Sequence, residues 1–285
     1  MKTTKSLIGN KLNLTKASAI VVALGLSACG AFAAATAFDT AANYVGPGWS
    51  TTPANLGTGF GAWNIAAINN NNPPYSGTYL DQTSYGNAGS VLNAGYSWGT
   101  YANGTDANGD IPALNMVRPF TTGGGTSSLL NQTFSVGIGS GGVGGAGSSL
   151  SVNIGTAFSL IYAGGGPDNM TLSVDGGAAS PIAVNMANLG AGLRIALSVT
   201  GPMNSPSEGY SLAFSPYFGG PTFLTINGTF DSSAYNTAGF TFLDYNTSAN
   251  GYVNDLSIIA VPEPSSMVLL GLSGLTTLLA IRRRK

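Results

Sequence analysis

Carboxylates are the main side chains here that could carry chemistry, because the 285-residue chain has no histidine and one cysteine, Cys29. A pair of carboxylates can hydrolyse a glycosidic bond when one acts as the acid and the other as the base or nucleophile. Between residues 38 and 261, however, the only glutamate is Glu208, and the aspartates lie mostly beside glycine or asparagine in turn-like contexts. We therefore expect a protein that is not an enzyme and needs no cofactor, with a glycoside hydrolase as a distant alternative.

Three oxygen-bearing side chains stand at alternate positions, as in a site for a hard cation. Asp106, Asn108 and Asp110 match positions one, three and five of a calcium-binding loop. The rest of the pattern fails, since Ile111 stands where the loop needs a glycine and Val117 where it needs a bidentate glutamate. The favoured interpretation is an Asx-rich turn between strands, with a weak calcium site as the alternative.

A glycine-rich stretch contains the spacing of a dinucleotide-binding loop. Gly137, Gly139 and Gly142 fit G-x-G-x-x-G, whose third glycine must open a helix that faces the pyrophosphate. The residues that follow are typical of a strand instead, and a chain with 42 glycines is expected to contain such a match by chance. We interpret residues 137–147 as a glycine loop or an irregular edge.

Aromatic residues crowd the first third of the chain. Exposed tyrosine and tryptophan rings form platforms for sugars or partners, because they are large and amphipathic. Tyr75, Tyr79 and Tyr85 lie among proline, glycine and serine residues, which makes them the best candidates for an exposed set that contacts extracellular polysaccharide. For any single aromatic residue, including those at positions 49, 63 and 98, burial in a sandwich core is the favoured alternative.

Charge is scarce and unevenly placed. Only 7% of the residues are charged, and eight of the ten basic residues lie in the first 16 or the last four positions. Residues 38–261 carry ten acidic and two basic residues, a net charge of −8. A nucleic-acid partner is therefore excluded, because binding to phosphates needs a basic face.

The elements that must position these residues are predicted to be strands. Between residues 34 and 260 short apolar–polar alternations are separated by glycine- and asparagine-rich turns, and no stretch keeps a 3.6-residue period. This pattern predicts one β-sandwich domain, with strands near 133–138, 149–162, 170–174, 195–199, 210–214, 224–226, 240–245 and 252–259. Asp175-Gly176-Gly177 and Asn227-Gly228 have the composition of hairpin turns.

The N-terminus has the organisation of a secretory signal peptide. Four lysines precede the apolar run of residues 17–28, and small residues at 31–33 and 35–37 both fit an A-x-A cleavage site. We predict a signal peptide over residues 1–33, removed by signal peptidase. An alternative is that Leu26-Ser27-Ala28-Cys29, which resembles the lipobox of bacterial lipoproteins, directs lipidation of Cys29.

The C-terminus has the organisation of a membrane anchor. Residues 265–281 form an uncharged run at the short end for a transmembrane helix. A cluster of four bases follows: Arg282, Arg283, Arg284 and Lys285. Basic residues stay on the cytoplasmic side, so the body is expected on the opposite side of the membrane.

The same tail carries a family resemblance. Val261-Pro262-Glu263-Pro264-Ser265, a short apolar helix and a terminal basic cluster together resemble the PEP-CTERM sorting signal of Gram-negative bacteria. The resemblance implies a transient inner-membrane anchor, recognition by an exosortase-like membrane protease, cleavage near Pro-Glu-Pro, and delivery to the cell surface or extracellular matrix. An ordinary permanent tail anchor is the alternative.

The body carries a looser resemblance. The segments at 57–63, 97–103, 117–120 and 132–136 are similar to an uncharacterised group of PEP-CTERM exported proteins with jelly-roll-like bodies. The expected fold class is therefore all-β: a single jelly-roll-like β-sandwich (34–260) between an N-terminal signal peptide and a C-terminal transmembrane helix. We expect an exported, non-enzymatic surface or matrix protein, with a carbohydrate-binding module as the alternative.

Overall fold

A computed structural model describes residues 35–68, 76–82, 91, 95–104, 111–120, 129, 132–200, 208–231, 239–246 and 250–260. Nearly every regular element within these ranges is a strand. The predicted signal peptide, Cys29 and the whole of residues 261–285 lie outside the described residues. No helix in the described part of the chain is long and apolar enough to cross a membrane, and the span expected at 265–281 falls beyond it.

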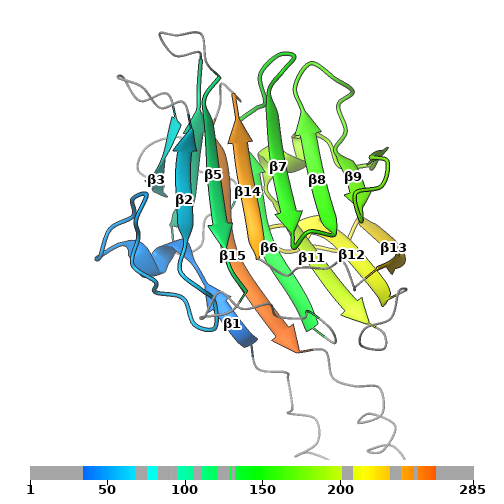
Figure 1. The fold of residues 1–285 in the computed structure, drawn as a ribbon, viewed down its shortest axis with the longest axis horizontal. Helices are drawn as coiled ribbons and strands as arrows, with labels where there is room; N and C mark the ends of the chain where they lie inside the picture. Colours follow the sequence, from blue (N-terminus) through cyan, green and yellow to red (C-terminus); the bar gives the residue numbers. More distant parts are fainter. Residues whose placement is uncertain are drawn as a thin grey trace, which may run out of the picture. The chain divides into compact units, whose positions relative to one another are not determined.

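One layer of the molecule, named the front layer although it lies behind the other in the view of Figure 1, is organised around its last strand, β15. This strand pairs with β6 along one side, and along the other side first with β4 and then with β1. The layer continues past β6, because β11 lies beside it with a 2.7 Å hydrogen bond between the Thr133 and Ser198 hydroxyls (Figure 1). Its strands, all antiparallel to their partners, are β1 (Ala35–Asp39), β3 (Ser76–Gln82), β4 (Tyr96–Ala102), β6 (Gln132–Ser140), β11 (Leu193–Thr200), β12 (Glu208–Pro216), β13 (Leu224–Phe230) and β15 (Gly251–Ala260).

The back layer, which is the nearer one in the view of Figure 1, is a seven-stranded antiparallel sheet in the order β10-β9-β8-β7-β14-β5-β2. Its strands are β2 (Asn64–Ile68), β5 (Ala113–Arg118), β7 (Ser149–Ile154), β8 (Phe158–Ala163), β9 (Thr171–Val174), β10 (Ser180–Pro181) and β14 (Phe240–Tyr245). Two short helices, η1 (Ala41–Tyr44) and α2 (Met186–Ala191), complete the described elements. The predicted all-β, jelly-roll-like sandwich is confirmed.

The alternating sequence pattern places the core between the two layers. In β11, Leu193, Ile195, Leu197 and Val199 are buried, while the residues between them are partly exposed. Successive side chains of a strand point to opposite faces, so one face of each sheet joins the core and the other faces outward. Each buried aliphatic side chain contributes about 1.5–3 kcal/mol to the free energy of unfolding.

One of the two predicted hairpin turns is confirmed and the other is wrong. Asp175 and Gly176 have φ values of 52° and 67°, and the Gly177 amide donates to the Val174 carbonyl at 2.9 Å, which is a type I′ turn. Asn227 and Gly228 instead lie inside β13, because Gly228 faces Tyr210 of β12 and leaves room for its ring. The chain reverses earlier, between β12 and β13.

The glycine-rich stretch also differs from its prediction. Gly137 and Gly139 belong to β6, and the irregular segment begins only after Ser140. The next element is the strand β7, so no helix follows the G-x-G-x-x-G spacing. Gly137 is needed within the strand because the ring of Tyr217 lies against it, where any side chain would collide.

A hydrogen-bonded pair at the end of β8 gives a pH-dependent stability. The Tyr162 hydroxyl donates to Asp168 Oδ1 at 2.7 Å, and the Met186 amide donates to the same oxygen at 3.2 Å. The hydrogen bond from Tyr162, and secondarily the Met186 amide, lowers the pKa of Asp168 below 3.8. Burial, and then the hydrogen bond to Asp168, raises the pKa of Tyr162 from 10.0 to about 12.

These opposite pKa shifts define a pH window. The contribution of Asp168 is present above its unfolded pKa and is lost as pH falls through the lowered folded value. The contribution of Tyr162 is present below pH 10 and is lost as pH rises towards about 12. Chemical unfolding should therefore show that the wild type has a higher free energy of unfolding than Asp168→Asn. The difference should be constant between about pH 5 and 9 and should shrink below about pH 4. A difference that stays the same into acid would contradict this assignment.

Candidate functional site

The outward side of the front layer carries tyrosine rings packed against glycines. The sequence Gly-Thr-Tyr occurs in β3, at Gly77 to Tyr79, and again in β4, at Gly99 to Tyr101. The antiparallel register sets Gly77 opposite Tyr101 and Tyr79 opposite Gly99, and each ring lies over the facing glycine. The two ring centroids are 6.4 Å apart. The glycines thus let both rings lie against the sheet.

Two further tyrosines extend this arrangement across the layer. Tyr252 of β15 and Tyr217, which follows β12, form a buried cluster with Val91, and Tyr79 packs against that cluster. Burial, followed by a hydrogen bond with Tyr252, raises the pKa of Tyr79, so its hydroxyl stays protonated at physiological pH. We call Tyr79, Tyr101, Tyr217 and Tyr252 the outer tyrosine row.

An ion pair lies at one end of the outer tyrosine row. Arg194 Nη2 is 3.6 Å from Asp255 Oδ2, and the Tyr217 hydroxyl donates to that oxygen at 2.7 Å. The guanidinium carbon lies 5.0 Å from the centre of the Tyr217 ring, a cation–π distance. The Arg194 side chain is 32% exposed. The end of the row therefore presents a fixed guanidinium, with N–H groups that reach solvent, beside an aromatic ring.

Exposed aromatic rings near charged groups suit a polyhydroxylated ligand, because rings cover C–H faces while charged groups bond hydroxyls. In the outer tyrosine row Tyr79 and Tyr101 keep partly exposed rings, whereas Tyr217 and Tyr252 are 6% and 5% exposed. Of the tyrosines predicted to contact polysaccharide, Tyr79 lies in the row and is half-buried. Tyr75 and Tyr85 lie outside the described residues. The repeated Gly-Thr-Tyr is the signal that could have identified Tyr101, whereas Arg194 and Tyr217 come together only through the fold.

The tryptophans occupy the interior instead. Trp98 is fully buried and Trp63 is 6% exposed. The rings of Trp49, Trp63 and Trp98 pack with centroids 5.0–5.5 Å apart. The alternative of core burial therefore holds for these two buried tryptophans, and Trp49 is partly buried against them.

Next to the tryptophans lies a buried ion pair. Arg118 Nη2 is 2.9 Å from Asp39 Oδ2, and neither side chain is exposed. The same carboxylate accepts hydrogen bonds from the Tyr44 hydroxyl at 2.9 Å and from Trp63 Nε1 at 3.2 Å. The guanidinium lies 5.2 Å from the Trp63 ring centre. With no exposed atom, this cluster holds the core together and offers no surface to a ligand.

The remaining carboxylates of the described residues are mostly engaged. Asp244 is buried and accepts a 2.8 Å hydrogen bond from the Thr100 hydroxyl, and Asp81 and Glu208 are also buried. Within the described ranges no group of three histidine, cysteine, aspartate or glutamate residues could hold a metal ion. Asp106, Asn108 and Asp110 lie outside those ranges, so the calcium interpretation stays a prediction.

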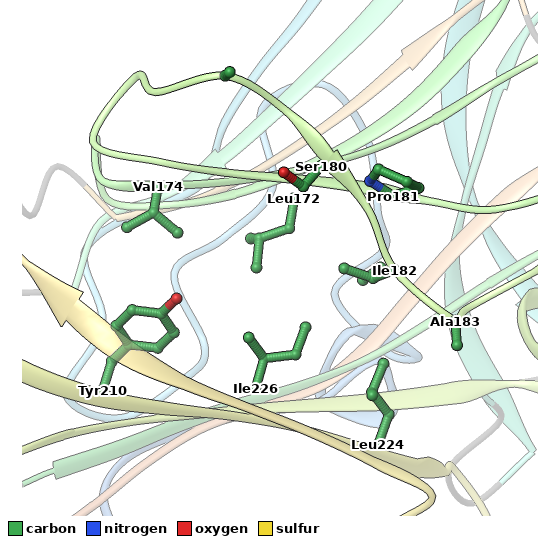
Figure 2. A pocket seen from close by; sticks show the side chains of 10 residues that line it. Leu172, Val174, Ser180, Pro181, Ile182, Ala183, Tyr210, Leu224 and Ile226 are labelled. Atoms are coloured by element: carbon green, nitrogen blue, oxygen red, sulfur yellow. The ribbon is translucent and has the colours of Figure 1, made fainter.

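An apolar pocket of about 540 Å³ lies where the two layers part at their edges. Leu172 and Ile182, from the back layer, face Leu224 and Ile226 of β13 across the opening, with Tyr210 of β12 at one end (Figure 2). The sequence pattern did not predict this pocket, because each of its aliphatic residues taken alone looks like a core position.

Comparison with solved structures gives distant similarities. The lumenal domain of VIP36 bound to Ca²⁺ and Man3GlcNAc has a TM-score of 0.42 at 8% identity, covering 61% of this chain and 85% of that one. A structure described with endo-acting O-glycanases of the human gut microbiota has a TM-score of 0.42 at 9% identity, covering 79% and 98%. The catalytic domain of a glycoside hydrolase family 131 protein from Coprinopsis cinerea has a TM-score of 0.38 at 14% identity, covering 65% and 78%. These values are too low to carry a ligand or an activity across.

Comparison with curated proteins found no match. Comparison with protein families matched residues 260–285 to the PEP-CTERM protein-sorting motif. The matched range contains the whole of the predicted signal, from Val261 through Pro264 to the cluster at 282–285. The chain therefore carries a PEP-CTERM protein-sorting motif at its C-terminus and is an exported protein sorted through a transient membrane anchor.

Proposed function

We propose that this chain is a non-enzymatic protein of the cell surface or extracellular matrix, released from its membrane anchor when an exosortase-like protease cuts its tail. The observation that carries the proposal is the position of the sorting motif. The motif match begins at residue 260, and β15 ends at Ala260. The motif therefore begins where the last described strand ends.

The boundary between the body and the sorting motif lies at the end of β15, the central strand of the front layer. β15 pairs with β1, β4 and β6, so three strands depend on it. A cut near Pro262-Glu263-Pro264 would leave every described strand in place, whereas a cut a few residues earlier would enter the sheet. This arrangement supports a body that persists after processing.

The structural use of the carboxylates supports a role without catalysis. Asp39, Asp244 and Asp255 each accept a hydrogen bond that ties two elements together. A general acid or base must instead reach a substrate proton. Incubation of the exported protein with a polysaccharide panel should release no reducing ends, and release of reducing ends would overturn the non-enzymatic part of the proposal.

Replacing Pro262-Glu263-Pro264 with three alanines should block processing without preventing membrane insertion. The apolar run and the basic cluster that position the tail are unchanged, while the sequence offered to the protease is lost. Immunoblots of membrane and surface fractions should show the variant retained in the membrane at precursor size. Pro181→Ala, at an exposed position outside the sorting motif, is the matched control and should be processed like the wild type.

A second candidate function is carbohydrate binding, favoured by the outer tyrosine row and its ion pair. Tyr79→Ala combined with Arg194→Ala should weaken binding to a matrix polysaccharide by about tenfold or more, because both a ring surface and a charged hydrogen-bond donor are lost. Tyr245→Ala, on the back layer, is the matched control. Equal binding by all three proteins, with melting temperatures preserved, would remove this candidate.

A further inference from the structure

The strand β13 is the last strand of the front layer on one side. Among the described residues it pairs with β12 and with no other strand. Its residues Thr225, Asn227, Gly228 and Thr229 are exposed. An edge strand presents a row of backbone N–H and C=O groups that can pair with a strand from another chain.

Proteins usually protect such edges with charges, prolines or very short strands. The neighbouring edge of the back layer follows this rule, since β10 has two residues and one is Pro181. β13 is seven residues long and contains neither a charge nor a proline. The whole segment from residue 209 to residue 230 is uncharged, in a body whose net charge is −8. Two acidic copies that pair along β13 therefore bring no charged side chains of this segment together.

The sequence of β13 is complementary to itself. We propose that two copies of this protein associate through antiparallel pairing of their β13 strands, about a two-fold axis at Asn227. In this register Thr225 lies opposite Thr229 of the second copy, and Ile226 lies opposite Gly228 of the second copy. Threonine–threonine pairs stabilise antiparallel strands, and the two Asn227 amides face each other across the axis.

On the inner side of the sheet, the proposed pairing would cover apolar surface of the pocket. Leu224 and Ile226 line the pocket together with Tyr210 (Figure 2). The Tyr210 ring also covers Gly228. Because Gly228 has no side chain, Ile226 of one copy can pack beside it in the other, against Tyr210. By symmetry this contact forms twice. It covers apolar surface that lies at the open edge between the layers.

An exposed aromatic residue lies at the start of the same strand. Phe223 immediately precedes β13 and is 44% exposed. In the proposed register Phe223 of one copy lies opposite Asp231 of the second copy, just past the end of β13, so the pairing would cover part of its ring. The burial of Phe223 and Ile226 adds a hydrophobic contribution to the backbone hydrogen bonds. This inference does not depend on the sorting proposal, because it concerns the folded body alone.

Sedimentation of the exported protein over a range of concentrations tests the proposal. We expect a concentration-dependent shift to twice the mass of the single processed chain. Asn227→Lys should abolish the shift, because two lysines would meet at the axis. Asn64→Lys, also an exposed asparagine on an edge strand, β2, should leave it unchanged. A wild type that stays monomeric, or equal dimerisation of Asn227→Lys, would overturn the proposal.

Disulfide trapping tests the register independently of affinity. Directly opposed residues of antiparallel strands have Cα atoms about 4.5–5.5 Å apart, within the range that a disulfide spans. Asn227→Cys should give a disulfide-linked dimer on mild oxidation, whereas Asn64→Cys and the wild type should not. Equal cross-linking of both cysteine variants would indicate random collision and would contradict the pairing. Circular dichroism and melting temperature establish that each variant is folded.

Discussion

Asp39→Ala is expected to lower the free energy of unfolding by about 3–5 kcal/mol. The substitution leaves the Arg118 guanidinium fully buried without its carboxylate partner 2.9 Å away. It also removes the acceptor for the Tyr44 hydroxyl and Trp63 Nε1. Burial of a charge without a partner is among the largest single-residue penalties in proteins. Urea unfolding followed by tryptophan fluorescence measures the change.

The double variant Asp39→Ala/Arg118→Met separates the ion pair from the loss of packing. Burial raises the pKa of Asp39 and lowers that of Arg118, even though each charge favours the other. Desolvation therefore opposes both charges, and removal of both should cost less than the sum of the single variants. Additive single-variant effects would show that the two groups are not coupled and would contradict this description of the core.

Asn254→Ala is expected to cost about 3–5 kcal/mol, since several buried polar groups lose their partner at once. Asn254 lies where β15 changes partner from β4 to β1. Its Oδ1 accepts from the Ala41 amide at 2.9 Å and from the Thr40 hydroxyl at 3.1 Å. Its Nδ2 donates to the Val91 carbonyl at 2.9 Å and to the Tyr96 carbonyl at 2.7 Å.

The side chain of Asn254 thus fills the gap between two strand ends. Thermal unfolding of Asn254→Ala should show a much lower melting temperature, whereas Asn64→Ala, at an exposed strand position, should stay within about 0.5 kcal/mol of the wild type. If Asn254→Ala lowers the free energy of unfolding by less than about 1 kcal/mol, water replaces these hydrogen bonds and the proposed role of Asn254 is wrong.

The strands that could be predicted from sequence are those with one clearly buried face. β11 and β14 show regular alternation, and both appear where it predicts them. The strands β3 and β4, in the first third of the chain, show no such alternation. Their outward side carries glycines and tyrosines, and their buried side includes polar residues such as Ser76 and Thr100. Asn227-Gly228 was misassigned because local turn propensity was outweighed by pairing with β12.

The candidate site was predictable only in part. Tyr79 was identified from its context, but the pairing of Arg194 with Asp255 depends on β11 and β15 lying on either side of β6. The burial of Arg118 could not be predicted either, because an arginine with no acidic residue near it in sequence is typical of a protein surface. In each case two residues distant in sequence meet only after the strands are ordered, and strand order is not encoded in any local pattern.

The mass of the mature C-terminus tests the central claim most directly. Intact-protein and peptide mass spectrometry of the protein extracted from the cell surface should show a chain that ends near Pro262-Glu263-Pro264, with the whole of β15 present and residues 265–285 missing. A surface-extracted chain that still ends at Lys285 would show a permanent anchor and would contradict processing by an exosortase-like protease.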